Sequence, residues 1–196
     1  MLVVDTHPSQ YSAPFYRAFN QAYKGEMTVL FFSDFSNGKF RDSEFGKEIT
    51  WEEDLLAGYK NVVIEKNYQR SYISLFSPFI SFRFFYFILT YKGEKKFLLT
   101  GWNNINLIIF AFLSRFFKWD VNIRAESFDK FSRKRFTFIR HCILRICFKK
   151  IHKFFYIGTR SKSFYLKTLS VSDEQLAPSL YGVDNQRFSC PVKRSA

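Results

Sequence analysis

Cysteine, histidine and glycine are scarce in this sequence, which has 3 Cys, 3 His and 8 Gly among 196 residues. Cys142, Cys147 and Cys190 form no CxxC pair, and no histidine stands at the usual metal-ligand spacing from them. An odd number of cysteines without such a framework argues against disulfides and a structural zinc site and favours a reducing compartment. We therefore expect no metal site and no tightly bound cofactor.

A glycine-rich phosphate-binding loop is also missing. The stretch 5–15 follows the first apolar run and offers hydroxyl groups, the His7 imidazole and backbone amides, but no glycine pattern. A dinucleotide site or P-loop is therefore disfavoured. Two interpretations of His7 stay open, because it can serve a binding site or only form local hydrogen bonds in a strand-to-helix turn.

The chain has no uninterrupted hydrophobic run that reads clearly as a membrane span. Residues 71–91 are long enough to cross a bilayer, but Pro78 and Arg83 interrupt them. A central arginine costs about 2.5–3.5 kcal/mol on insertion scales, so a buried helix beginning after Pro78 fits better. Asp5 follows the first apolar residues too soon for an export signal, and we expect a cytoplasmic protein.

Positive charge is abundant and unevenly distributed. The net charge is +13, made of −3 over residues 1–60, +4 over 61–129 and +12 over 130–196. With 47% hydrophobic and 24% charged residues, the composition is that of one globular domain. The asymmetry predicts a face directed at an anionic partner such as a membrane surface, a nucleic acid or a phosphorylated ligand.

Short apolar runs alternate with longer helical patterns along the chain. Runs that are apolar on both faces are typical of buried parallel strands, and their alternation with helices predicts an open, mostly parallel α/β sheet of the Rossmann type with helices on both faces. Ligands of such sheets gather at the carboxyl ends of the strands. The expected strands are 2–4, 28–32, 62–64, 97–99, 121–123 and 155–157, and the expected helices are 14–24, 79–91, 103–117, 132–151 and 160–168, with Asn103 as a candidate cap.

Two of the expected strand ends carry side chains suited to binding chemistry. Gly101 allows a close backbone approach, and Trp102 offers a flat face for a sugar ring, although tryptophan is more often a core residue. Arg124 and Glu126 leave the next strand on the same side, where Arg can bind phosphate and a carboxylate can hold hydroxyls or accept a proton. A structural ion pair is the alternative for these two residues.

The expected helix 132–151 lies in a strongly basic stretch, because residues 130–153 contain nine Lys or Arg and no acid. Spacing predicts that its opposite side carries cations with Phe138 and Phe148 among them. Phenylalanine between cations favours an anionic membrane surface contacted by Phe138, Arg145, Phe148 and Lys149, although a plain solvated basic helix is the alternative. The stripe expected to face inward consists of Phe136, Ile139, Ile143, Cys147 and Ile151.

Several short motifs follow one another along the chain. They are Thr6-His7-Pro8, Gln10-Tyr11, Ala13-Pro14, Asp42-x-x-Phe45-Gly46, Trp51, Leu55-Leu56-x-Gly58-Tyr59, Ile157-Gly158-Thr159 and Tyr181-Gly182-Val183-Asp184-Asn185-x-x-Phe188. In this order and spacing they resemble the family 4 glycosyltransferases of the GT-B fold. The resemblance runs from Val3 to about Phe188 and covers only the amino-terminal domain of that family. Two departures are Thr100, where relatives commonly have His, and Ala125, where they often have Gly.

The resemblance implies transfer of a sugar from a nucleotide-sugar to a glycan or lipid-linked acceptor, with retained anomeric configuration and no required metal. It implies that residues 1–188 form the acceptor-side domain, that 189–196 are a short tail, and that the nucleotide-sugar binds to a donor domain absent from this chain, which by itself would be inactive. Arg124 and Glu126 are the expected catalytic pair. The expected acceptor site comprises His7, Tyr11, Ser12, Trp51, Gly101, Trp102, Ser127 and Gly158.

Two other functions stay open at this point. The chain can be a non-catalytic partner of a separate donor-binding subunit. A basic, aromatic-rich face is also expected of a nucleic-acid-binding module, but none of the usual signatures of such a module is present. We expect nucleic acid to be the weaker alternative, and a cytoplasmic location on the inner membrane face to be the setting for polysaccharide synthesis.

Overall fold

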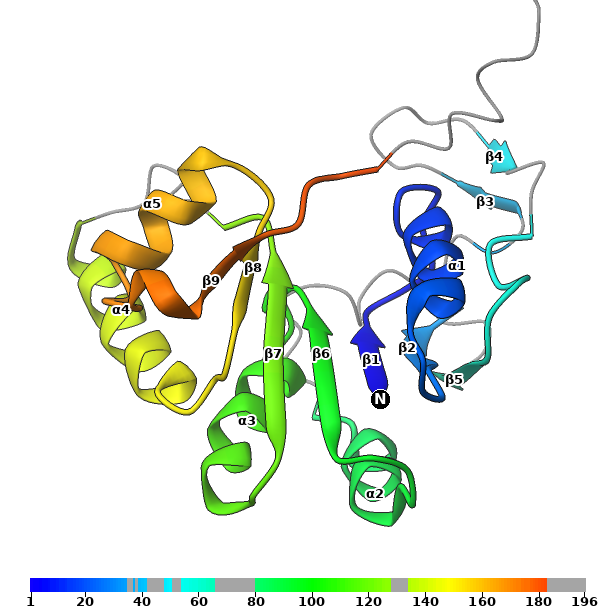
Figure 1. Cartoon of the computed structure of the whole chain (residues 1–196), viewed down its shortest axis with the longest axis horizontal. Helices are drawn as coiled ribbons and strands as arrows, with labels where there is room; N and C mark the ends of the chain where they lie inside the picture. Colours follow the sequence, from blue (N-terminus) through cyan, green and yellow to red (C-terminus); the bar gives the residue numbers. More distant parts are fainter. Residues whose placement is uncertain are drawn as a thin grey trace, which may run out of the picture.

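The computed structural model describes residues 1–34, 37, 39–41, 48–50, 54–65, 80–127 and 134–182 (Figure 1). The strands and helices alternate, as the apolar pattern predicts. The strands are β1 (Leu2–Asp5), β2 (Thr28–Ser33), β3 (Lys39–Arg41), β4 (Glu48–Thr50), β5 (Asn61–Glu65), β6 (Lys96–Thr100), β7 (Asp120–Ala125), β8 (Phe154–Tyr156) and β9 (Leu176–Pro178). The helices are α1 (Ser12–Ala22), α2 (Phe82–Thr90), α3 (Ile105–Leu113), α4 (Lys134–Phe148) and α5 (Thr159–Lys167).

Seven of the strands form one parallel sheet in the order β5-β2-β1-β6-β7-β8-β9. Strands β2 and β5 therefore lie on one side of β1. Strand β6 lies on the other side of β1, followed outward by β7, β8 and β9. This order confirms the predicted Rossmann-like open α/β fold. Strand β9 was not expected from the sequence, nor was the separate antiparallel pair of β3 and β4.

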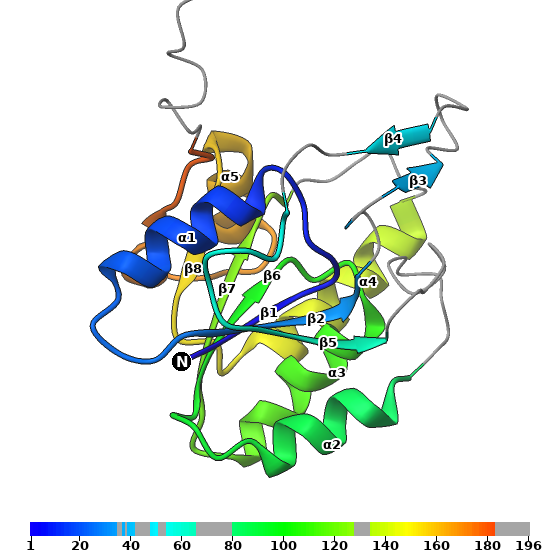
Figure 2. The same cartoon turned by 90° about the vertical axis from the view of Figure 1, so that its right-hand side faces the viewer.

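The sheet is buried on both faces because most residues in the middle of its central strands are apolar, such as Leu2–Val4 of β1 and Phe97–Leu99 of β6. Alternate residues of β1 point to opposite faces, so that Leu2 and Val4 belong to one core cluster and Val3 belongs to the other. Figures 1 and 2 show α1 on one face and α2, α3, α4 and α5 on the other. Helices thus cover both faces as expected, but unequally among the described elements.

Two helices differ in detail from the sequence expectation. The N-cap of α3 is Asn104 rather than Asn103, and its side chain accepts a hydrogen bond from the Asn106 amide at 2.9 Å. Helix α2 has Ser81 as its N-cap, and the Ser81 side chain accepts from the Phe84 amide at 3.2 Å. The start after Pro78 that the sequence suggested lies outside the described residues.

The inward face of α4 is not the stripe that the spacing predicted. Ile139 is 55% exposed and Ile143 is 50% exposed, whereas Leu144 and Phe148 are almost fully buried. Cys147 and Ile151 are buried as expected. The helix is therefore rotated toward Leu144 and Phe148, and apolar residues occur on both sides of it, which is why spacing alone selected the wrong stripe.

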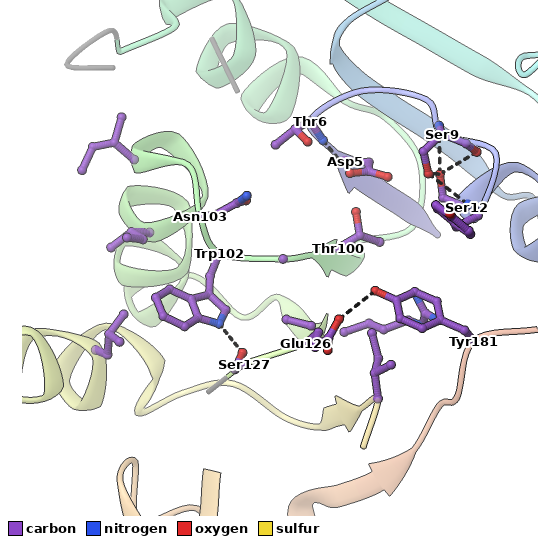
Figure 3. A pocket seen from close by; sticks show the side chains of 18 of the residues that line it. Asp5, Thr6, Ser9, Ser12, Thr100, Trp102, Asn103, Glu126, Ser127 and Tyr181 are labelled. Atoms are coloured by element: carbon purple, nitrogen blue, oxygen red, sulfur yellow. Dashed lines mark hydrogen bonds between the residues drawn. The ribbon is translucent and has the colours of Figure 1, made fainter. Parts of the chain in front are cut away.

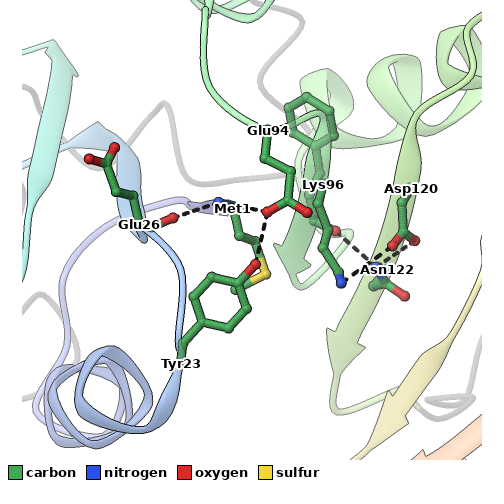
Figure 4. A network of polar contacts seen from close by, with 8 residues as sticks. Met1, Tyr23, Glu26, Glu94, Lys96, Asp120 and Asn122 are labelled. Atoms are coloured by element: carbon green, nitrogen blue, oxygen red, sulfur yellow. Dashed lines mark hydrogen bonds and ion pairs between the residues drawn. The ribbon is translucent and has the colours of Figure 1, made fainter.

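The amino-terminal edge of the sheet is held by a network of polar contacts (Figure 4). The Met1 ammonium group donates to the Glu26 carbonyl oxygen at 2.6 Å and lies 3.5 Å from a Glu94 carboxylate oxygen. The Tyr23 hydroxyl donates to the same carboxylate at 2.9 Å, and this hydrogen bond is the main cause that lowers the Glu94 pKa. These contacts join the end of α1 to the loop before β6.

Within the described ranges, no helix is long and apolar enough to cross a membrane. Helix α2 has only nine residues and begins at Phe82, so it covers the second half of the apolar segment 71–91. Residues 71–79 of that segment lie outside the described part.

Candidate functional site

A pocket of about 1220 Å³ opens at the carboxyl ends of β1, β6 and β7 (Figure 3). In the sheet, β2 lies on one side of β1 and β6 lies on the other. The pocket is therefore at the topological switch point, where the strand order changes direction. Parallel α/β sheets bind ligands at such a point because the two loops leave the sheet in opposite directions. Helix α4 and the segment after β9 complete the wall. The pocket's charged and hydroxyl-bearing residues are Asp5, Thr6, Ser9, Tyr11, Ser12, Tyr16, Thr100, Arg124, Glu126, Ser127, Arg140 and Tyr181.

Asp5 ends β1 and is buried at the base of the pocket. Its carboxylate accepts a hydrogen bond from the Tyr16 hydroxyl at 2.5 Å and one from the Thr6 amide at 2.7 Å. Burial raises the pKa of Asp5, and these hydrogen bonds and the nearby His7 oppose that rise. The carboxylate therefore ties the loop after β1 to helix α1.

Arg124 lies near the carboxyl end of β7 and is a buried cation, with only 7% of its surface exposed. Its Nε donates to Ser179 Oγ at 2.9 Å, and its guanidinium lies over the Phe15 ring at 4.4 Å and the Tyr181 ring at 5.5 Å. Burial lowers the Arg124 pKa. Within the described residues, no carboxylate lies within ion-pair distance of this guanidinium. Arg124 thus joins the segment after β9 to the pocket.

Glu126 lies two residues beyond Arg124 and is exposed at the pocket. The Tyr181 hydroxyl donates to a Glu126 carboxylate oxygen at 3.4 Å, a long hydrogen bond that leaves the carboxylate accessible. The Tyr181 ring lies 6.5 Å from the Tyr11 ring, and both tyrosines are more than half exposed. Two aromatic rings and a carboxylate therefore form the rim at this end of the pocket.

Trp102 is part of the wall and not a free platform. It is 8% exposed, its indole stacks on Phe164 at 6.1 Å, and the Arg140 guanidinium lies 5.0 Å from its centroid. Its Nε1 donates to Ser127 Oγ at 2.6 Å. The expectation of an open sugar-stacking face at Trp102 is therefore wrong, because neighbouring helices cover the indole.

Gly101 is placed as the sequence suggested. Its φ of +98° lies in the left-handed region that favours glycine, and its amide donates to the Arg124 carbonyl oxygen at 2.8 Å. This turn brings the ends of β6 and β7 together, so that Trp102 and Ser127 face each other.

The other end of the pocket is lined mainly by aliphatic side chains, with the Arg140 guanidinium beside the Trp102 ring as its charged group. Ile105 and Ile108 come from α3, and Ile143 and Leu144 come from α4. Figure 3 shows Asp5, Ser12 and Tyr181 on one side of the pocket, away from Trp102 on the other. The cavity therefore has a hydrogen-bonding end and an aliphatic end.

The structure brings together most of the site residues expected from sequence. His7 and Gly158 do not line the pocket. His7 is half-buried, with its Nδ1 atom 2.9 Å from the Thr6 hydroxyl oxygen, and Gly158 precedes α5. Trp51 and the 42–46 motif lie outside the described residues. The expected residues that line the pocket are Tyr11, Ser12, Gly101, Trp102, Arg124, Glu126 and Ser127.

Eight polar residues of the pocket were not among the site residues expected from sequence. Asp5 and Thr100 end their strands, and their position at the strand tips was the available signal. Tyr16 lies inside α1 and reaches the pocket because its hydroxyl turns toward Asp5. Tyr181 was named only as part of the motif that begins with it, and no sequence pattern shows that this segment lies at the pocket. The other four residues are Thr6, Ser9, Asn103 and Arg140.

The expected membrane-facing residues of α4 separate into two groups. Phe138 is 69% exposed, and Arg145 and Lys149 are also exposed. Phe148 is 4% exposed and packs edge-on against Trp102 at 6.2 Å. The assignment of Phe148 to a membrane surface is therefore wrong, because its ring fills the core between α4 and the sheet.

The structure is thus a Rossmann-like α/β fold with a pocket at the switch point of its sheet. Among the residues that the structure describes, no group of three or more His, Cys, Asp or Glu could hold a metal ion. No protein-family model matches the chain, and no curated protein matches it significantly.

Proposed function

We propose that this domain binds the acceptor in a glycosyl transfer reaction of the GT-B type. The observation that carries the proposal is the single pocket at the switch point that combines Arg124, Glu126, Tyr11 and Ser12. Sugars are bound by carboxylates and hydroxyls that pair with their hydroxyl groups and by aromatic rings that contact their apolar faces. The polar end of the pocket offers both.

Glu126 is the residue best placed to act on an acceptor hydroxyl. Its carboxylate is exposed at the pocket, and among the described residues it accepts a hydrogen bond from the Tyr181 hydroxyl at 3.4 Å. In the proposed reaction it orients the attacking hydroxyl and accepts its proton. Arg124 positions the wall formed by Tyr181 through its contacts with Ser179 and the tyrosine ring.

The beginning of α1 supports binding of an acceptor rather than of a dinucleotide. The amides of Ser12 and Ala13 donate to the Ser9 carbonyl oxygen at 3.1 Å and 2.9 Å, so they are already paired. Phosphate-binding helix starts direct such amides at the ligand instead. In the proposal, the nucleotide-sugar binds to a separate donor-binding domain or subunit, as the resemblance implies, and a non-catalytic role beside such a subunit is the second form of the proposal.

A glycan-binding experiment tests the polar end of the pocket. We expect the protein to bind a subset of an immobilised glycan panel, and Glu126→Gln to weaken that binding at least about tenfold, because a charge-assisted hydrogen bond to the ligand is lost. Glu174→Gln is the matched control, since Glu174 is exposed and lies away from the pocket. Equal binding by both variants and the unmodified protein would exclude the assignment of this pocket to a sugar acceptor.

We also propose that the exposed side of α4 binds an anionic membrane. It carries Phe138, Ile139 and Ile146, each more than half exposed, together with the cations Arg145 and Lys149. Exposed aliphatic residues among cations favour insertion into lipid over nucleic-acid binding, which uses stacking aromatic rings. In this proposal, binding through α4 would bring the acceptor site close to the membrane.

Vesicle sedimentation tests the membrane surface. Each basic residue near an anionic surface is worth about 1 kcal/mol, so Lys149→Gln/Lys150→Gln should lower partitioning onto phosphatidylglycerol-containing vesicles roughly thirtyfold. Lys24→Gln/Lys92→Gln removes the same charge from exposed positions on other elements and should have little effect. Equal losses in the two variants would show that net charge, and not this helix, controls binding. A steeply salt-dependent affinity for duplex DNA would instead favour the nucleic-acid alternative.

A further inference from the structure

The pocket is larger than a sugar headgroup requires, and its two ends differ in chemistry. Its volume of about 1220 Å³ exceeds the roughly 300–1000 Å³ typical of small-molecule sites. Figure 3 shows Asp5, Ser12 and Tyr181 at one end of the pocket, while Ser127 lies beside Trp102, whose ring the Arg140 guanidinium covers. The remaining volume is bounded by aliphatic side chains of α3 and α4.

The aliphatic end is open to the outside along α4. Leu144 is buried in the floor, whereas Ile143 lines the same pocket and is still 50% exposed. Ile139 and Ile146 lie on the same side of the helix as Ile143, four residues before it and three after it, and each is also more than half exposed. An apolar path therefore continues from inside the pocket onto the helix surface.

We infer that the acceptor is an amphiphile whose alkyl chain occupies the aliphatic end of the pocket. This inference rests on the proposed function, and it specifies the class of acceptor. The sugar or other polar headgroup lies at Glu126 and Tyr11, while the chain passes Ile108 and leaves the pocket over Ile143. A free glycan would leave this aliphatic end filled only by water, which gains nothing from apolar walls.

Binding of N-phenyl-1-naphthylamine, whose fluorescence rises in apolar surroundings, tests the aliphatic end without knowledge of the headgroup. We expect saturable binding to the unmodified chain and displacement by octyl β-D-glucoside below its micelle concentration, with methyl β-D-glucoside at least about tenfold less effective. A buried methylene is worth roughly a fourfold gain in affinity, so even partial burial of the octyl chain provides this difference.

Two variants locate the binding. Ile143→Gln should weaken reporter binding at least about fivefold, because it places an amide in the aliphatic end of the pocket. Leu89→Gln is the control, since Leu89 is 63% exposed on α2 and neither lines the pocket nor belongs to the apolar path along α4. This control variant should bind the reporter as the unmodified chain does.

Three outcomes would overturn the inference: no saturable reporter binding, equal weakening by the two variants, or equal displacement by the octyl and methyl glucosides. None of these outcomes would contradict the proposed function if Glu126→Gln still weakened glycan binding at least about tenfold. Conversely, a glycan panel that ignores Glu126 would remove the sugar-acceptor role while leaving an apolar ligand site. The two proposals can therefore fail separately.

Discussion

Replacing Tyr16 by Phe removes the hydroxyl that donates to Asp5 at 2.5 Å in the base of the pocket. Both residues are buried, so water does not readily replace the lost donor. A hydrogen bond to a charged group contributes about 1.5–3 kcal/mol to stability, whereas one between neutral groups contributes about 0.5–1.5 kcal/mol. Tyr16→Phe should therefore lower the free energy of unfolding by about 1.5–3 kcal/mol when Asp5 is ionised.

The loss of unfolding free energy caused by Tyr16→Phe should increase with pH. Burial raises the Asp5 pKa above its ordinary value of 3.8, so stability of the unmodified protein falls as pH rises from that value through the folded-state pKa. The Tyr16 hydroxyl opposes the rise, and its loss should raise the Asp5 pKa further. The difference in the free energy of unfolding between Tyr16→Phe and the unmodified protein is then small at low pH, where Asp5 is protonated in both. It grows with pH as Asp5 ionises.

The matched control is Tyr59→Phe. The Tyr59 ring lies 5.5 Å from the Tyr16 ring, and its hydroxyl donates to the neutral Leu55 carbonyl oxygen at 2.5 Å. Urea denaturation followed by circular dichroism at several pH values measures both variants. Tyr59→Phe should cost about 0.5–1.5 kcal/mol at every pH below the tyrosine pKa. A cost for Tyr16→Phe that is constant with pH would refute the assignment of Asp5 as a buried carboxylate stabilised by this hydroxyl.

Two further substitutions test the packing around the pocket. Phe148→Ala should lower the free energy of unfolding by about 3–5 kcal/mol because it empties a buried site, while Phe138→Ala should cost less than about 0.5 kcal/mol because Phe138 is largely exposed. Similar values for the two would contradict the observed rotation of α4. Gly101→Ala should cost about 1–3 kcal/mol because its φ is +98°, whereas Gly182→Ala, which has open space and no left-handed φ, should be nearly neutral in the same denaturation assay. A neutral Gly101→Ala would count against the turn that brings Trp102 to Ser127.

The sequence by itself determined the class of fold and the edge of the sheet at which the site lies. Apolar runs such as 29–32 and 97–99 could be assigned to buried parallel strands because they are apolar on both faces. Strand-to-helix alternation then requires the loops after β1, β6 and β7 to share one edge. Gly101 and Arg124 could be expected at that edge for this reason.

Only the tertiary structure decided which side of a helix is buried and which distant segments meet. Helix α4 has apolar residues on both sides, so its packing partners, Trp102 and Phe154, select Phe148 for the core and leave Ile143 half exposed. The return of Tyr181 over the sheet depends on its contact with Arg124, 57 positions earlier, which no local pattern records. Local sequence specifies periodicity, but burial and long-range contacts depend on the whole arrangement of neighbours.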